Sequence, residues 1–314
     1  MKIITLPEIK TAVSQLDPLP AIEAGFVAYS AGEAVVPPVG ELIMSDPPGD
    51  VHIKYGYLKG GDSYVIKIAS GFYENYKLDL PTSNGMMLLF DQKTGVPLAT
   101  LLDEGYLTDL RTAVAGAIAA KYLAPKNVTC IGIVGTGIQG RMQLEHLKEI
   151  TPCREVVVWG RTQEKVAAYV ADMTGEGFRV TAVSTTSELA ACCNLIVTTT
   201  PATEPLLMAD AIQAGTHITA MGSDTHHKQE LDAAILTKAN LVVADSISQC
   251  LERGEIMQAL KHDAIQTADL VELGDVIAGK ATGRTSEDEI TVADLTGVAV
   301  QDIQITTAVY QALA

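Results

Sequence analysis

The central and C-terminal parts of the chain alternate short apolar runs with amphipathic segments. The apolar runs lie at residues 128–134, 155–160, 179–183, 195–200, 217–222 and 241–245. Segments of helical composition fit between them, for example 139–150 and 162–173. Strands that are apolar on both faces and separated by helices are typical of a parallel sheet covered on both sides. This part of the chain therefore predicts a doubly wound α/β domain.

Up to about residue 110 the pattern is different, because apolar and polar residues alternate within the runs. Three such runs lie at 51–58, 63–70 and 84–91, and Gly60-Gly61-Asp62 separates the first two as a hairpin turn would. A short helix is expected around 17–31. Alternation with turn residues between the runs is typical of antiparallel strands. We expect a mixed α+β region built on an antiparallel sheet.

A segment rich in small residues joins the two patterns. It reads RTAVAGAIAAKYLA and ends at Pro125, and its Ala and Gly content predicts a helix that packs closely on a neighbour. The last 25 residues begin as a strand and continue as a helix. A chain of 314 residues exceeds the usual size of one core, so we expect two domains.

Charge and composition exclude several classes of protein. The chain has 22 Lys and Arg against 38 Asp and Glu, a formal net charge of −16, which disfavours nucleic acid and anionic membranes as partners. A hydrophobic content of 47% argues against disorder. No apolar run has the length of a membrane span or a signal peptide. The five cysteines lack CxxC spacing, which indicates reduced thiols and a cytoplasmic protein.

Neighbouring metal-ligand residues occur, but in an unsuitable arrangement. His226-His227 and Cys192-Cys193 are adjacent pairs. Adjacent residues do not converge on one ion without further ligands at suitable spacing. We therefore expect no metal site.

A glycine-rich turn follows the apolar run 128–134 and opens a predicted helix. Its residues are Gly135, Thr136, Gly137, Ile138, Gln139 and Gly140. In this context GxGxxG is typical of a Rossmann-type dinucleotide site, in which a diphosphate rests on the helix N-terminus. Thr199, Gly222 and Asp224, which follow later strands, are expected to contact the same cofactor. The alternative is an ordinary glycine-rich turn between a strand and a helix.

The end of the next predicted strand indicates which dinucleotide binds. An NAD site normally has Asp or Glu here, which binds the ribose hydroxyls, but this strand ends in Gly160-Arg161-Thr162. A guanidinium pairs with a 2′-phosphate. The sequence therefore predicts NADPH as the preferred cofactor, with NADH as a second possibility. Alternatively, Arg161 is a solvated first-turn residue and Thr162 caps the helix.

Four motifs in order carry a family resemblance. They are EGYLTDLRTAVAGAIAAKYLAP, IGIVGTGIQG, AMGSDTHHKQELD and GRTSEDEITVADLTGVAVQD. Together they resemble the ornithine cyclodeaminase and mu-crystallin family, from roughly Val51 to the C-terminus. The resemblance implies a homodimer in which each chain has a Rossmann domain at 113–292. It also implies a substrate-binding and dimerisation domain made of residues 1–112 and 293–314.

The resemblance also implies two cationic ligands for a substrate carboxylate, Lys67 and Arg111. An α-imino or α-amino acid needs its carboxylate held while the adjacent carbon reacts. Lys54 is expected to add a cation nearby, which disfavours a diamine substrate. The alternatives are a lysine on the solvent face of its strand for Lys67 and a surface salt bridge for Arg111.

Asp224, in Met221-Gly222-Ser223-Asp224, matches a catalytic Asp of the family. Its expected role is to exchange a proton with the substrate nitrogen; the alternative is a cap for a loop or for a helix beginning near Lys228. The resulting hypothesis is a reductase of a small 2-imino acid, with Δ1-pyrroline-2-carboxylate as first candidate. Alternatives are an ornithine-type cyclodeaminase, an amino acid dehydrogenase such as alanine dehydrogenase, and a cofactor-binding protein without turnover.

Overall fold

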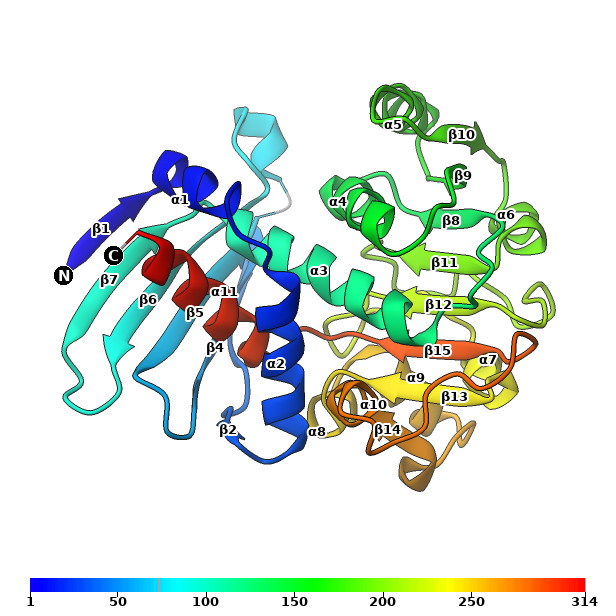
Figure 1. Ribbon diagram of the computed structural model, residues 1–314. Helices are drawn as coiled ribbons and strands as arrows, with labels where there is room; N and C mark the ends of the chain where they lie inside the picture. The colour runs from blue at the N-terminus through cyan, green and yellow to red at the C-terminus, as the bar shows by residue number, and fades with distance from the viewer. Residues whose placement is uncertain (73, 314) are drawn as a thin grey trace. The chain divides into compact units, whose positions relative to one another are not determined.

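The computed structural model describes residues 1–72 and 74–313, and it divides into two units, each with its own β-sheet (Figure 1). Met1–Arg111 and Val298–Ala314 form one unit, which we term the discontinuous unit. Thr112–Gly297 forms the other, the central unit. The central unit ends at Gly297, a few residues after the expected boundary at 292/293. The reason is that Thr291–Asp294 is a strand of the central sheet.

The discontinuous unit contains, among the described residues, a seven-stranded sheet ordered β1-β7-β6-β5-β4-β2, with β3 paired to β4. The strands are β1 (Lys2–Thr5), β2 (Ala34–Val35), β3 (Gly40–Ser45), β4 (Pro48–Leu58), β5 (Ser63–Gly71), β6 (Ser83–Asp91) and β7 (Pro97–Leu102). β4 to β7 pair antiparallel, and β1 joins β7 in parallel. The predicted antiparallel sheet is confirmed, since β4, β5 and β6 are the three alternating runs.

The C-terminal helix α11 (Ala299–Ala312) packs on β4, β5 and β6 and against α2 (Leu19–Ser30). A Cβ atom at Gly25 of α2 would lie 2.9 Å from Cγ of Gln304, so a glycine permits this close approach. Thr306 of α11 lies against Met87 of β6, with 2.6 Å between Oγ1 and Sδ. The helix α1 (Leu6–Val13) and the 3-10 turn η1 (Asn75–Leu78) also belong to this unit. The two ends of the chain therefore share one core.

In the central unit, eight described strands form a parallel sheet ordered β10-β9-β8-β11-β12-β15-β13-β14. The strands are β8 (Ile131–Val134), β9 (Glu155–Trp159), β10 (Arg179–Ala182), β11 (Leu195–Thr198), β12 (His217–Ala220), β13 (Leu241–Ala244), β14 (Leu270–Glu272) and β15 (Thr291–Asp294). The predicted Rossmann-type sheet is confirmed, and each of the six apolar runs supplies a strand. The short β14 was not expected.

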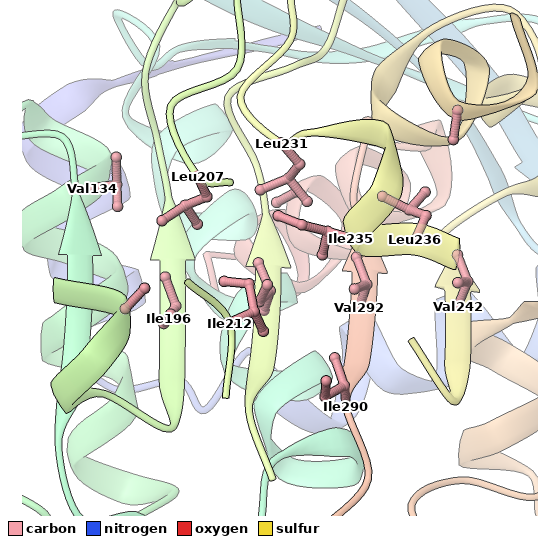
Figure 2. Packing of buried hydrophobic residues seen from close by; sticks show 14 of the residues in the cluster. Val134, Ile196, Leu207, Ile212, Leu231, Ile235, Leu236, Val242, Ile290 and Val292 are labelled. Atoms are coloured by element: carbon pink, nitrogen blue, oxygen red, sulfur yellow. The ribbon is translucent and has the colours of Figure 1, made fainter. Parts of the chain in front are cut away.

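Helices connect these strands on both sides of the sheet (Figure 1). They are α4 (Ile138–His146), α5 (Gln163–Gly175), α6 (Thr186–Cys192), α7 (Ala233–Lys238), α8 (Ile247–Cys250), α9 (Gly254–Lys261) and α10 (Leu273–Ile277), with 3-10 turns η2 (Leu147–Glu149) and η3 (Thr267–Asp269). The strand residues alternate between two apolar clusters. Val134 and Ile196 belong to the cluster of Figure 2, whereas Ile133 and Val197 belong to the other. Burial on both faces explains the near-continuous apolar runs.

The helix rich in small residues is α3 (Tyr106–Leu123). A Cβ atom at Gly116 would lie 1.9 Å from Oε1 of Gln143 on α4. The buried Gln143 side chain donates from Nε2 to the carbonyl oxygen of Thr112 at 3.0 Å. A Cβ atom at position 116 would therefore displace the Gln143 amide, and the close packing predicted from the small residues is confirmed. Among the described residues, no helix has both the length and the apolar character to cross a membrane.

Candidate active site

The glycine-rich turn connects β8 to α4 in the central unit. Gly135 has a φ of 118°, in the region that favours glycine. A Cβ there would also lie 2.6 Å from Oγ1 of Thr199, and a Cβ at Gly140 would lie 2.4 Å from the carbonyl oxygen of Gly135. Gly137, the N-cap of α4, differs, since nothing lies within 4 Å of its Cβ position. The two outer glycines therefore permit tight packing, and the middle one faces open space.

The turn is held by side chains that the motif does not include. Arg141 donates from Nη1 to the carbonyl oxygens of Thr136 (2.5 Å) and Gly137 (3.3 Å). Its Nε and Nη2 donate to Asp172 at 2.9 and 2.6 Å. Tyr169 donates its hydroxyl to the carbonyl oxygen of Gly140 at 2.9 Å. None of these side chains caps the first turn of α4. The N–H groups of that turn can therefore bind an anion.

A cavity of about 490 Å³ opens over this turn. Seven of the expected cofactor residues line it: Gly135, Thr136, Gly137, Ile138, Arg161, Thr162 and Thr199. Gln139, Gly140, Gly222 and Asp224 do not line it. Gly140 is buried beneath the turn, and the Gln139 amide oxygen accepts a hydrogen bond from Gln143 at 3.4 Å.

The cavity walls carry positive charge. Arg141, Arg161 and Lys165 line it, and none of the described lining residues is acidic. Arg161 and Lys165 are exposed at the start of α5. Thr162 is the N-cap of α5 and makes no side-chain cap hydrogen bond. Sequence reasoning missed Lys165. It lies four residues after Arg161, about one helical turn, and this spacing could have indicated that the two side chains are neighbours.

Asp224 lies in the loop after β12, with its side chain 42% exposed. Its Oδ1 accepts a hydrogen bond from Nζ of Lys228 at 2.7 Å, a pairing that the sequence reasoning did not anticipate. The described residues contain no helix beginning near Lys228; α7 begins at Ala233 with Asp232 as its N-cap. The helix-capping alternative for Asp224 is therefore wrong.

The two expected carboxylate ligands lie together in the discontinuous unit. Lys67 on β5 and Arg111 on α3 are 2% and 5% exposed, which excludes a solvent-facing lysine and a surface salt bridge. Both cations face Asp302 of α11. Oδ1 of Asp302 accepts from Nε of Arg111 at 3.0 Å, and its Oδ2 lies 3.8 Å from Nζ of Lys67. Sequence reasoning missed Asp302, which is 191 residues from Arg111.

The Arg111 guanidinium has a second partner besides Asp302. Its Nη1 donates to Oε1 of Gln301 at 3.0 Å. Among the described residues, Nη2 donates no hydrogen bond. A planar guanidinium with one donor available can still bind a ligand oxygen.

Lys54 lies beside Lys67, because the two are direct partners in the β4–β5 register. It is buried, with 8% exposure. His52, two residues earlier, lies 3.6 Å from Glu41 and 3.8 Å from Asp50. Asp103, at the end of β7, is also buried, and burial raises the pKa of its carboxyl while the Lys67 charge opposes the rise. Three cations and two carboxylates are thus buried in one unit.

Among the described residues, no group of three or more His, Cys, Asp or Glu side chains is arranged to hold a metal ion.

The fold and these residues define the class as an NAD(P)H-dependent oxidoreductase. The chain belongs to the ornithine cyclodeaminase/mu-crystallin family, whose model matches residues 2–314. The resemblance drawn from the four motifs is therefore confirmed.

Three relatives illustrate this membership. An uncharacterised cyclodeaminase of Sinorhizobium fredii is 43% identical over 99% of this chain and 95% of its own. An archaeal alanine dehydrogenase, solved as a dimer with bound NAD, is 35% identical with a TM-score of 0.92, covering 99% and 95% of the two chains. The Δ1-pyrroline-2-carboxylate reductase of Thermococcus litoralis, solved with NADH and L-proline, is 28% identical with a TM-score of 0.93 over 99% and 97%.

Proposed function

We propose that this protein is an NADPH-dependent reductase of a small 2-imino acid, with Δ1-pyrroline-2-carboxylate, which gives proline, as the first candidate substrate. The observation that carries the proposal is the buried group Lys67–Asp302–Arg111. Two buried cations face one carboxylate there, and the buried carboxyl of Asp103 also feels the Lys67 charge. Two cations brought together away from water favour the binding of a further anion.

The substrate carboxylate supplies that anion. Nη2 of Arg111 and the ammonium of Lys67 would hold it by charge-assisted hydrogen bonds. Asp302 and Gln301 fix the guanidinium plane from the other side. A held carboxylate fixes the neighbouring C=N carbon, which is the atom that must be aligned for reaction.

The cofactor fits the central unit. The N–H groups at the start of α4 would bind its diphosphate, and the open space at Gly137 lets a phosphate approach the backbone. When bound, reduced nicotinamide supplies the hydride. Arg161 and Lys165 would bind a 2′-phosphate, and the lack of an acidic residue among the described lining removes the usual partner of the ribose hydroxyl.

Asp224 is the proposed proton donor to the substrate nitrogen. Reduction of a C=N bond adds a hydride to carbon and a proton to nitrogen, giving the amine and the oxidised cofactor. Asp224 is exposed enough to exchange protons with water, and Lys228 orients its carboxylate. It would donate to the imine nitrogen, since a protonated imine is the better electrophile.

We also propose that the protein acts as a homodimer, in line with the archaeal alanine dehydrogenase dimer. Light scattering coupled to gel filtration would give about twice the mass of 33.2 kDa. A monomer at micromolar concentration would contradict this part of the proposal.

The function is tested by a spectrophotometric screen with NADPH and NADH. We expect nicotinamide oxidation with Δ1-pyrroline-2-carboxylate or with a 2-oxo acid plus ammonia or methylamine. Failure with a broad panel of these compounds would refute the reductase. Ammonia release from ornithine without net cofactor turnover would identify a cyclodeaminase, and oxidation of alanine would identify an amino acid dehydrogenase.

Cofactor preference is tested by the paired variant Arg161→Ser/Lys165→Ser. We expect the ratio of kcat/KM for NADPH to that for NADH to fall by about tenfold or more, because two cations at the phosphate are lost. Arg179→Ser is the matched control, since Arg179 is an exposed arginine of the same unit outside the cavity lining. An unchanged ratio in the paired variant would show that these residues do not select the cofactor.

A further inference from the structure

Two loops leave neighbouring strands of the central sheet at the edge where ligands gather in this fold. The loop after β11 contains Thr199, Thr200, Pro201 and Ala202, which all line the cavity. The loop after β12 contains Gly222 and Asp224. The first loop belongs to the cofactor cavity, and the second carries the proposed proton donor.

The carboxylate of Glu230 joins these loops. Its Oε1 accepts hydrogen bonds from the backbone N–H of Thr200 at 2.6 Å and from Oγ1 of Thr200 at 2.7 Å. Its Oε2 accepts from the backbone N–H of Gly222 at 2.9 Å and from Oγ1 of Thr198 at 2.7 Å. Glu230 is 0% exposed, so these bonds do not compete with water.

The loops approach each other so closely that a side chain would separate them. A Cβ atom at Gly222 would lie 2.2 Å from the carbonyl oxygen of Thr200 and 2.5 Å from Oε2 of Glu230. The first of these atoms is backbone and cannot rotate away. Glycine at this position is therefore part of the same contact.

Four donors around two oxygens match the acceptor capacity of an ionised carboxylate. Burial raises the pKa of Glu230, and the four hydrogen bonds oppose the rise. The buried neighbour Glu255 has its pKa raised to about 8, first by burial and then by the Glu230 charge. The four donors thus favour the ionised form of Glu230, against the effect of burial.

The position of Glu230 is itself fixed by other buried carboxyl groups. Glu255 accepts from the backbone N–H of Glu230 at 2.7 Å and from that of Leu231 at 3.1 Å. Asp294, at the end of β15, accepts from the backbone N–H of Ile256 at 2.8 Å. Glu255 thus holds the backbone at Glu230, and Asp294 holds the backbone next to Glu255. These contacts restrict the position of Glu230.

We propose that Glu230 is a positioning residue that fixes Asp224 relative to the cofactor-lining loop. It does not touch the reacting atoms but acts through the backbone of Thr200 and Gly222. The inference rests on the proposed function for the role of Asp224, and the contact itself is independent of that role. We term the hydrogen bonds of Glu230 to Thr198, Thr200 and Gly222 the Glu230 clasp. Loss of this clasp should slow the proton-coupled step more than it weakens binding of the imino acid or of NADPH.

The test is Glu230→Gln, which keeps the shape but replaces one acceptor oxygen with an NH₂ group. Two of the four donors then lose their acceptor. We expect kcat to fall by about tenfold or more while KM for the imino acid and Kd for NADPH change by less than about threefold. Trp159 reports NADPH binding, because it is the only tryptophan in the chain and lines the cavity.

Hydrogen exchange tests the clasp without any substrate. In Glu230→Gln we expect faster exchange at the amides of Thr199, Thr200 and Ala202 and of residues 221–225, and unchanged exchange in the strands of the central sheet. Glu289→Gln is the matched control, because Glu289 also accepts from two backbone N–H groups and a threonine hydroxyl, in a different loop. That variant should keep wild-type kcat and wild-type exchange in both loops.

If Glu230→Gln does not fold, Gly222→Ala separates the same loops and leaves the carboxylate in place. It should give the same fall in kcat with KM preserved. Retention of kcat within about twofold, or a rise in KM or Kd that accounts for the whole loss, would overturn the proposal. If the wild type reduces no imino acid, the proposed function fails separately, and the kcat comparison is made on whichever reaction the screen identifies.

Discussion

Asp302 and Glu230 are both carboxylates with at most 1% exposure, but their surroundings are opposite in kind. Asp302, in the discontinuous unit, faces the cations of Lys67 and Arg111. Glu230, in the central unit, faces two backbone N–H groups and two threonine hydroxyls. One charge is compensated by other charges, and the other by oriented dipoles.

This difference distinguishes the proposed binding region from the proposed positioning region. In the Lys67–Asp302–Arg111 group two buried cations face one carboxylate, and we propose that an anionic ligand binds there. The Glu230 clasp is already complete, since its two oxygens accept four hydrogen bonds. A buried ion group can therefore await a ligand, whereas a saturated carboxylate fixes loops.

The largest expected effect comes from removing the shared anion. Asp302→Asn keeps the shape of the side chain but leaves Lys67 and Arg111 buried without their carboxylate. We expect the free energy of unfolding, measured in urea, to fall by about 3–5 kcal/mol. The double variant with Lys67→Met should recover part of the loss, because one uncompensated cation is gone. A fall below about 1 kcal/mol would mean that the ion group contributes little to stability.

A smaller effect is expected when a cation is removed and the anion stays. Lys67→Met should lower kcat/KM for the imino acid by about tenfold to a hundredfold, since a charge-assisted contact to the substrate carboxylate contributes about 1.5–3 kcal/mol. Kd for NADPH should not change. Lys59→Met is the control, because Lys59 is an exposed lysine whose Nζ donates to the carbonyl oxygen of Gly32. Equal losses in both variants would contradict the assignment of Lys67.

The carboxyl groups of the central unit predict a pH effect on stability. Burial raises the pKa of Glu255 to about 8 from an ordinary value of 4.5, so the folded state keeps a proton that the unfolded chain releases. The contribution of Glu255 to the free energy of unfolding is therefore complete below pH 4.5 and is lost as the pH rises through 8. Buried His217 acts oppositely, because burial lowers its pKa from 6.5 to about 3. Its effect is complete above pH 6.5.

Between pH 6.5 and 8 the effect of Glu255 therefore has no opposition from His217. We expect the free energy of unfolding to fall by up to about 1.4 kcal/mol per pH unit in this window. Glu255→Gln should make the fall shallower, measured by urea unfolding at each pH. An equally steep fall in the variant would assign the proton to another group, such as Asp294, whose pKa burial also raises.

The smallest effect is expected at an exposed ion pair. Glu155 and Arg179 pair between β9 and β10, with side chains 50% and 70% exposed. Glu155→Gln should change the free energy of unfolding by less than about 1 kcal/mol, because water and salt screen such pairs. A loss as large as that of Asp302→Asn would show that burial does not decide the difference between these charges.

Sequence reasoning succeeded where the signal was local. The runs predicted β4, β5 and β6 of one sheet and β8 to β13 of the other, because side-chain periodicity depends only on the next few residues. The glycine-rich turn was predicted between a strand and a helix, and the structure has it there, between β8 and α4. Lys67 and Arg111 were also singled out, and the structure places them together, although their role toward substrate remains a prediction.

Sequence reasoning failed where a residue depends on a distant partner. Asp302 is 191 residues from Arg111; it is the last residue of the fourth family motif, yet no role was assigned to it. Glu230 lay within a recognised motif, yet nothing in the sequence indicated that its carboxylate would bind Thr200 and Gly222. The expected domain boundary at 292/293 divided the strand β15, but the whole strand pairs between β12 and β13.

The sequence by itself determined the family, the two sheet types and the dinucleotide turn, because these are written in local periodicity and in glycines with a fixed backbone task. Only the tertiary structure decided how buried charge is compensated. Compensation depends on which distant groups come within about 4 Å, and neither residue spacing nor the net charge of −16 contains that information.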